Sequence, residues 1–142
     1  MGRRRFPNRT MFLYLLDLEV KRAIRYQNFF CILKLKLSRP PDYENGKGRQ
    51  ACYQTLRHLL IEEMRESDIL GSLGEDQLAI LIPYADPSAG GSVRSRLEGS
   101  LKYYEFKNEG YEVRIDQISF PMDGTDTPGL VGKLLGQANP DG

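Results

Sequence analysis

The chain has 142 residues, a formal net charge of +1, and 40% hydrophobic and 27% charged residues. This length and composition predict one globular domain and exclude a disordered chain. The near-zero net charge gives no reason to expect a nucleic acid as partner, and no apolar run is long enough to span a membrane, so we expect a cytoplasmic protein without membrane insertion.

The two ends of the chain differ from the rest in composition. Residues 1–5 carry the only dense basic run, which we interpret as a solvated, flexible tail. We expect one domain over residues 6–139 and a second short tail over residues 140–142. The two cysteines, Cys31 and Cys52, lack the spacing of a metal or redox motif and are expected to be reduced core residues. His58 has no second histidine to form a metal or nucleophile pair, so we expect no metal and no cofactor.

The first half of the chain alternates between helical and strand patterns. Residues 10–26 repeat apolar residues at a spacing of three to four, which is typical of a helix with one buried face. Residues 29–37 alternate with period two, which predicts a strand with Lys34 and Lys36 on one face and Cys31, Leu33, Leu35 and Leu37 on the other. Prolines and glycines between residues 38 and 48 predict a loop, and helical spacing returns over residues 49–66.

The second half begins with a predicted β-hairpin. Residues 69–73 and 77–83 are short apolar runs joined by Gly74-Glu75-Asp76, which is typical turn chemistry. A helix is expected over residues 87–104, a strand over 111–120 and a short helix over 130–137. The order α-β-α-β-β-α-β-α predicts an α/β (α+β) domain close to the split βαβ ferredoxin-like plan, with helices packed on a sheet.

Several ordered fragments resemble one protein family. Arg65 and Asp68 form an Arg-x-x-Asp motif, and after five more residues come Gly74, Glu75, Asp76, Gln77 and Leu78, followed by an apolar strand. Upstream stands Pro7-Asn8-Arg9, and downstream stand Ser119-Phe120-Pro121 and Asp123-Gly124. In these fragments the chain resembles GGDEF domains, the bacterial diguanylate cyclases, from about residue 6 to 139. The resemblance implies a nucleotide-cyclase-like sheet with a signature β-hairpin.

The departures from the family pattern indicate lost catalysis. Family members condense two GTP molecules into cyclic di-GMP with divalent metal held at the hairpin and at the end of the first strand. Here Lys34 and Lys36 stand around the strand position of a metal-binding Asp, and an ammonium group cannot hold magnesium. At the signature, Glu75 replaces a glycine that permits positive φ and close approach to a ligand, and Gln77 replaces an acid. We therefore expect a pseudo-cyclase, not an enzyme, with no metal site.

Simpler interpretations of these residues stay open. Asp76 can be an ordinary hairpin-turn residue, and Lys34 and Lys36 can form a solvated strand face or bind phosphate. The guanine-contacting residues of the family have only Asn45 and Gln50 as their nearest counterparts. A weak enzyme with an unconventional metal site is a further alternative.

The Arg-x-x-Asp motif matches the inhibitory product site of active family members, which implies cyclic di-GMP as ligand. An arginine can donate to guanine O6 and N7, and a carboxylate can accept from guanine N1–H and N2–H. The family often adds an arginine from the next helix, for which Arg96, or failing that Arg94, is suitably placed. The sequence thus predicts an inactive GGDEF-like receptor that binds cyclic di-GMP through Arg65, Asp68 and Arg96, at exposed ends of helices and strands.

The same motif has a plain structural interpretation. Arg-x-x-Asp at a helix end is common as a solvated ion pair or a cap, worth at most about 1 kcal/mol when exposed. In that case the domain would bind no nucleotide and would serve in dimerisation or in contact with another signalling protein.

Overall fold

The computed structural model describes residues 6–38, 48–104, 106 and 110–136. The order of elements is the predicted one: α1 (Arg9–Tyr26), β1 (Phe30–Ser38), α2 (Arg49–Glu63), β2 (Ile69–Gly74), β3 (Gln77–Pro83), α3 (Pro87–Leu101), the short 3₁₀ helix η1 (Lys102–Tyr104), β4 (Glu112–Phe120) and α4 (Thr127–Leu134). Both predicted tails, most of the predicted loop after β1, and Asn45 lie outside the described residues.

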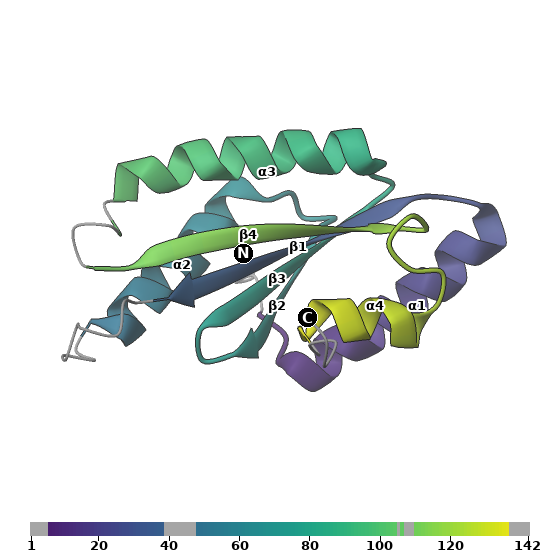
Figure 1. The fold of residues 1–142 in the computed structure, drawn as a ribbon, viewed down its shortest axis with the longest axis horizontal. Coiled ribbons are helices and arrows are strands. Elements are labelled where there is room, and N and C mark those ends of the chain that lie inside the picture. The colour runs from purple at the N-terminus through teal and green to yellow at the C-terminus, as the bar shows by residue number, and fades with distance from the viewer. Residues whose placement is uncertain (1–5, 39–47, 105, 107–109, 137–142) are drawn as a thin grey trace, which may run out of the picture.

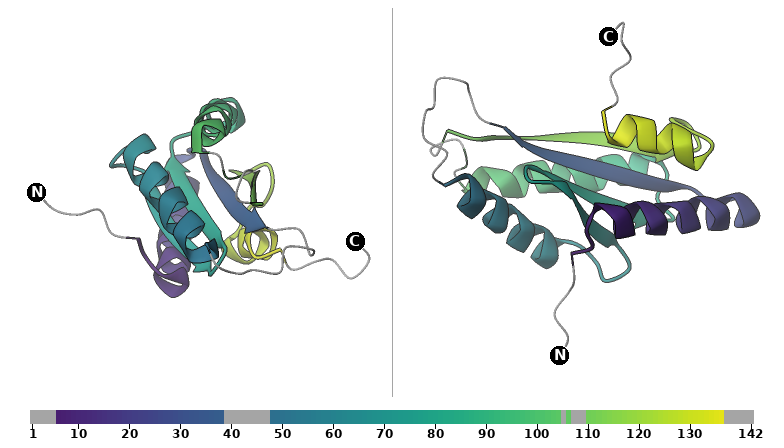
Figure 2. Two further views of the ribbon diagram at one scale, coloured as in Figure 1. Left: turned by 90° about the vertical axis from the view of Figure 1, so that its left-hand side faces the viewer. Right: turned by 90° about the horizontal axis from the view of Figure 1, so that it is seen from below.

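The four strands form one sheet in the order β2-β3-β1-β4, with every neighbouring pair antiparallel. Helices α2 and α3 cover one face of this sheet, and α1 and α4 cover part of the other (Figures 1 and 2). This arrangement confirms the predicted α+β class and its ferredoxin-like plan. No described helix combines the length and apolar character needed to cross a membrane.

Side-chain caps fix where three of the helices begin. Asn8 accepts a hydrogen bond from the Met11 amide of α1 at 2.9 Å. In α3 the Ala89 amide donates to Asp86, and in α4 the Gly129 amide donates to Asp126, at 2.8 Å each. Each such cap satisfies an amide that has no partner within its helix. The cap at Asp126 explains why α4 begins at Thr127, earlier than predicted. Helix α2 ends earlier than predicted because Met64 is already extended, with φ −94° and ψ 154°.

The central strand β1 is buried on both faces. Its alternating residues from Cys31 to Leu37 pack under α2 and α3, as predicted, while Phe30 and Ile32 pack under α1 on the opposite face. Phe30 also stacks on Phe120, with ring centroids 4.9 Å apart. Helices α1 and α4 therefore cover the first half of the β1 face that carries Lys34 and Lys36.

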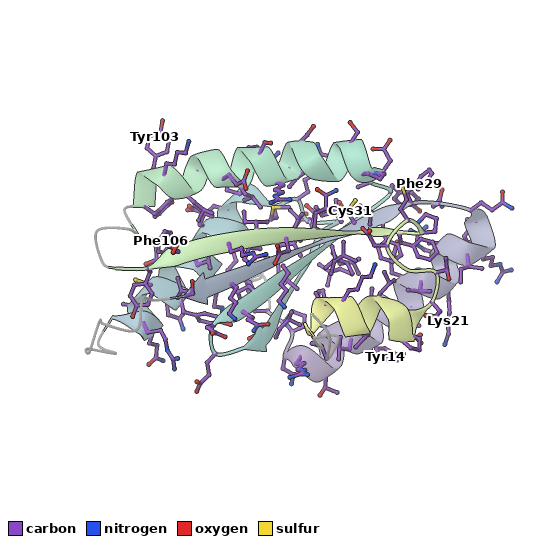
Figure 3. The ribbon with its side chains drawn as sticks, in the orientation of Figure 1. Tyr14, Lys21, Phe29, Cys31, Tyr103 and Phe106 are labelled. Atoms are coloured by element: carbon purple, nitrogen blue, oxygen red, sulfur yellow. The ribbon has the colours of Figure 1, made fainter. Side chains whose placement is uncertain are left out.

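Both cysteines are buried and reduced, as predicted. Cys31 lies between the sheet and the start of α3 (Figure 3), where its thiol is 3.4 Å from the carbonyl oxygen of Ala85 and 3.3 Å from Ser119 Oγ. Burial raises the pKa of the Cys31 thiol. Since the thiolate is the nucleophilic form, these contacts describe an unreactive core residue.

Two glycines of α3 provide a matched test of this packing. A methyl group on Gly99 would meet no atom within 4 Å, whereas on Gly90 it would lie 2.6 Å from Cys31 Sγ. We expect Gly99→Ala to raise the free energy of unfolding by about 0.5 to 1 kcal/mol, because alanine loses less backbone entropy in a helix. Gly90→Ala should lower it. Urea denaturation measures both, and equal shifts in the two variants would contradict this packing.

Candidate functional site

The Arg-x-x-Asp motif forms a closed turn between α2 and β2. The backbone amide of Arg65 donates to Asp68 Oδ2 at 2.9 Å, and the amide of Asp68 donates to the Arg65 carbonyl at 3.0 Å. The Arg65 side chain is exposed, as expected, but Asp68 is only 6% exposed. The expectation that both residues are exposed was wrong for Asp68, because its carboxylate turns back onto its own backbone.

Arg96 of α3 reaches the same end of α2. Its Nη2 donates to the Glu63 carbonyl at 3.2 Å, and its Nε lies 3.6 Å from Glu63 Oε1. Glu63 is the last residue of α2 and precedes Arg65 by two positions. The alternative candidate, Arg94, instead pairs with Glu98 of its own helix at 3.4 Å. The structure thus brings Arg65, Asp68 and Arg96 to one end of α2.

The signature residues Gly74 to Leu78 form the β2–β3 turn and the start of β3. Glu75 pairs with Arg49 at the start of α2, at 3.0 Å, and the Asp76 carbonyl accepts from the Leu37 amide at 2.8 Å. Leu78 is fully buried in the core under α2 and α3. No residue of this turn has positive φ, so Glu75 occupies the glycine position without backbone strain.

A cleft of about 510 Å³ separates the start of α2 from the hairpin, and Gln50 lines it. The Tyr53 hydroxyl lies 2.7 Å from Ser72 Oγ, and both hydroxyls lie 3.2 Å from the Gly74 carbonyl oxygen. Together with the Arg49–Glu75 pair, these contacts join the two walls of the cleft. Sequence reasoning missed Tyr53 and Ser72, because no motif connects residues nineteen positions apart.

Lys34 and Lys36 lie on the β1 face that α1 and α4 share, toward the hairpin end. Lys36 is exposed, whereas Lys34 is half-buried, and this burial lowers the pKa of the Lys34 ammonium group. No ion pair between described residues includes either lysine. Within the described ranges, no group of three or more His, Cys, Asp or Glu side chains is arranged to hold a metal ion.

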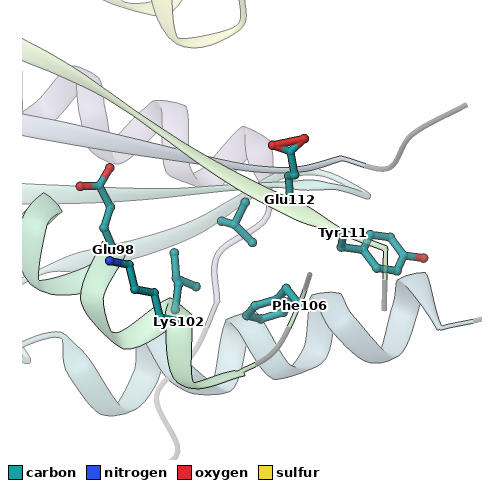
Figure 4. Close-up of a pocket in the computed structure, with 7 residues that line it drawn as sticks. Glu98, Lys102, Phe106, Tyr111 and Glu112 are labelled. Carbon is teal, nitrogen blue, oxygen red and sulfur yellow. The ribbon is translucent and has the colours of Figure 1, made fainter. Parts of the chain in front are cut away.

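Another hollow of about 510 Å³ lies between the end of α3 and the start of β4 (Figure 4). Leu101, Phe106 and Val113 form its apolar lining, and Glu98 and Glu112 stand at its rim. No candidate site residue from the sequence lines it, and its charged lining residues, Glu98, Lys102 and Glu112, are exposed. We assign it no role in the candidate site.

Several solved structures have the same fold as this chain. A DGC protein from Thermotoga maritima superimposes with a TM-score of 0.78 and 20% identity, covering 92% of this chain and 93% of that one. The FimX GGDEF domain from Pseudomonas aeruginosa superimposes with a TM-score of 0.74 and 19% identity, covering 96% of this chain and 91% of that one. The GGDEF domain of DgcB from Caulobacter crescentus was solved in complex with c-di-GMP. It superimposes with a TM-score of 0.64 and 14% identity, covering 94% of this chain and 86% of that one.

The chain therefore has the fold of GGDEF domains, as the sequence resemblance predicted. No protein-family model matches the sequence, and the search of curated proteins finds no match.

Proposed function

We propose that this chain is a cytoplasmic, catalytically inactive GGDEF-like regulatory domain that binds cyclic di-GMP through Arg65, Asp68 and Arg96. The observation that carries the proposal is the gathering of these three residues at the end of α2. The DgcB domain, which shares the fold, was solved in complex with c-di-GMP. We extend that ligand to this chain on the strength of the shared fold and the Arg-x-x-Asp motif.

The chemistry of the three side chains suits a guanine dinucleotide. The exposed Arg65 guanidinium can donate to guanine O6 and N7 or stack on the base. A carboxylate has about four acceptor sites, so the Asp68 oxygen bonded to the Arg65 amide can accept further bonds. Arg96 lies exposed beside them and can donate to a phosphate. Such contacts would discriminate guanine from adenine through Asp68 and hold the phosphates through arginine.

Residues near the end of β1 and in the β2–β3 hairpin support the proposed lack of catalytic activity. Lys34 and Lys36 place two positive charges where the family resemblance requires a metal-binding acid, and Gln77 replaces a second acid. Phosphoryl transfer from GTP depends on metal ions that offset the developing charge. The contacts of Tyr53 and Glu75 also occupy the cleft between α2 and the hairpin.

We expect the purified protein to form no cyclic di-GMP from GTP with magnesium or manganese. Gln77→Glu alone should not restore activity, because β1 would still lack an acid at Lys34 and Lys36. Product analysis by chromatography tests both statements, with an active cyclase run in parallel. Accumulation of product above a protein-free sample would overturn the proposed inactivity.

A second candidate is a ligand-free domain used for dimerisation or for contact with another signalling protein. The observation that favours it is that Asp68 and Arg96 already have structural roles, in the turn after α2 and at the end of α2. The outer face of α1 also exposes Met11, Tyr14 and Leu18. Titration with cyclic di-GMP separates the candidates, because only the first predicts saturable binding.

A further inference from the structure

The sheet has two outer edges, and a described segment covers only one of them. At the β2 edge, the Ser72 amide donates to the Pro7 carbonyl at 2.9 Å, and the strand is short and irregular after Ser72. At the other edge, β4 keeps an unbroken register with β1 over nine residues, and no other described strand lies beside it (Figure 1). A long, regular edge of this kind can pair with a further strand.

Asp123 shows which backbone groups of β4 face the open edge. The Ser119 amide donates to Asp123 Oδ2, and the Ser119 carbonyl accepts from the Asp123 amide, both at 2.7 Å. Ser119 therefore points its backbone groups away from β1. Every second residue of an antiparallel strand does the same, so Gln117, Ile115 and Val113 also direct their amides and carbonyls outward.

The neighbouring strand agrees with this alternation. Leu37 of β1 is paired with Val113, and its amide donates to the Asp76 carbonyl at 2.8 Å, on the side away from β4. Among the described residues, none forms a hydrogen bond with the outward backbone groups of Val113, Ile115 or Gln117. The edge therefore presents a run of unpaired backbone donors and acceptors that is centred on Ile115.

The charges of β4 select one register in which a second copy of the strand can pair. When two identical strands run antiparallel about a two-fold axis, one residue lies opposite itself across that axis. With Ile115 on the axis, Arg114 of each copy lies opposite Asp116 of the other. With Arg114 or Asp116 on the axis, identical charges would face one another, which destabilises strand pairing. An axis at Val113 or Gln117 would leave one end of each strand without a partner strand.

The register centred on Ile115 suits the backbone as well as the charges. The outward backbone groups of the two copies would meet in hydrogen-bonded pairs, and Arg114 and Asp116 would hold the positions between them, where facing side chains approach most closely. Both side chains are accessible, at 76% and 46% exposed. Within one chain, the residue directly paired with Arg114 on β1 is Lys36, a like charge, so a carboxylate on the other side of Arg114 is favourable.

The hollow between the end of α3 and the start of β4 adjoins the same edge (Figure 4). Val113 belongs both to its apolar lining and to the residues with outward backbone groups. A second copy laid along β4 would remove part of this apolar surface from water, which adds a hydrophobic contribution to the strand pairing.

We propose that β4 is a homodimerisation edge. Two copies of the chain pair their β4 strands antiparallel, with Ile115 on the two-fold axis and Arg114 opposite Asp116 of the second copy, and so form one continuous sheet. The site proposed for cyclic di-GMP stays accessible, because Arg65 and Asp68 precede β2 at the opposite edge of the sheet. Dimerisation and ligand binding are therefore tested separately, and failure of one leaves the other undecided.

Sedimentation equilibrium of the full chain tests the proposal. We expect a monomer–dimer equilibrium that weakens as ionic strength rises, because the contacts between Arg114 and Asp116 are exposed. Val113→Pro should abolish the dimer, since it removes an outward amide while leaving the bonds to β1 in place, and its circular dichroism spectrum should match the parent's. A wild-type chain that stays monomeric up to about 1 mM overturns the proposal.

Charge reversal tests the register. Arg114→Asp and Asp116→Arg each place like charges opposite one another, and each should raise the dissociation constant of the dimer roughly tenfold to hundredfold. A mixture of the two variants restores an arginine opposite an aspartate at every such position and should form a one-to-one dimer about as stable as the parent's. Arg25→Asp, the same change in charge at an exposed position of α1, should leave the dimer intact.

Two results would contradict this interface. The first is a mixture of Arg114→Asp and Asp116→Arg that fails to dimerise although each variant keeps the parent's circular dichroism spectrum. The second is a dimer that neither Arg114→Asp nor Val113→Pro weakens, which would place the contact elsewhere, for example on the outer face of α1.

Discussion

Gly71→Ala is expected to lower the free energy of unfolding by about 1 to 3 kcal/mol, the usual cost of overpacking a well-filled core. A methyl group on Gly71 in β2 would lie 2.3 Å from Phe12 Cδ1, 2.7 Å from its Cγ and 2.9 Å from its Cβ. Phe12 is fully buried in α1, and its Cβ cannot move away unless the helix backbone moves too. The clash therefore acts on the contact between α1 and the sheet.

Gly74→Ala in the same strand is the control, because a methyl group there would meet no atom within 4 Å. Its free energy of unfolding should stay within about 0.5 kcal/mol of the parent. In urea denaturation, the double variant Gly71→Ala/Phe12→Leu should lose less than the sum of the single changes, because the smaller side chain makes room. Additive losses in the free energy of unfolding would show that the methyl group added at Gly71 does not clash with Phe12.

Arg65→Ala is expected to weaken cyclic di-GMP binding roughly tenfold to hundredfold, the loss of one charge-assisted contact of about 1.5 to 3 kcal/mol. The backbone amide and carbonyl of Arg65 form the turn with Asp68, so the turn should survive the substitution. Arg94→Ala, which removes an arginine paired within α3, is the matched control and should leave the affinity unchanged. Equal losses in the two variants would point to a nonspecific charge effect.

Asp68 needs a substitution that keeps its turn. Asp68→Ala would remove the acceptor of the Arg65 amide as well as any ligand contact, so its effects on stability and binding would be mixed. Asp68→Asn keeps a carbonyl oxygen for that amide but replaces an acceptor with a donor. We expect it to retain the parent's circular dichroism spectrum while losing selectivity for guanine over adenine. Retained selectivity would exclude Asp68 from base recognition.

The sequence predicted every element of the sheet because each has a strong local pattern. The alternation from Cys31 to Leu37 and the turn at Gly74 to Asp76 both specify strands within a few residues. Boundaries depended on single caps, such as Asp126 before α4, whose effect on the helix start was not anticipated. The burial of Phe30 and Ile32 could not be predicted, because periodicity does not reveal which elements cover a strand.

The candidate site was predictable in residue identity but not in geometry. The motif spacing singled out Arg65 and Asp68, yet the burial of Asp68 follows from a bond to a backbone amide that no pattern encodes. The pair between Arg49 and Glu75 likewise joins residues far apart in sequence, which only the fold brings together. The half-burial of Lys34 arises because β1 is a central strand and because Gly136, just after α4, lies close to the Lys34 ammonium group, which the alternation along β1 does not reveal.

Isothermal titration of the unmodified protein with cyclic di-GMP tests the central claim most directly. Our account predicts saturable binding that Arg65→Ala weakens and Arg94→Ala does not, with little heat from a cyclic adenine dinucleotide. Even a weak interaction of roughly 5 to 6 kcal/mol would begin to show at ligand concentrations of about 100 μM. No saturable binding in that range would contradict the receptor function and favour the ligand-free interaction domain.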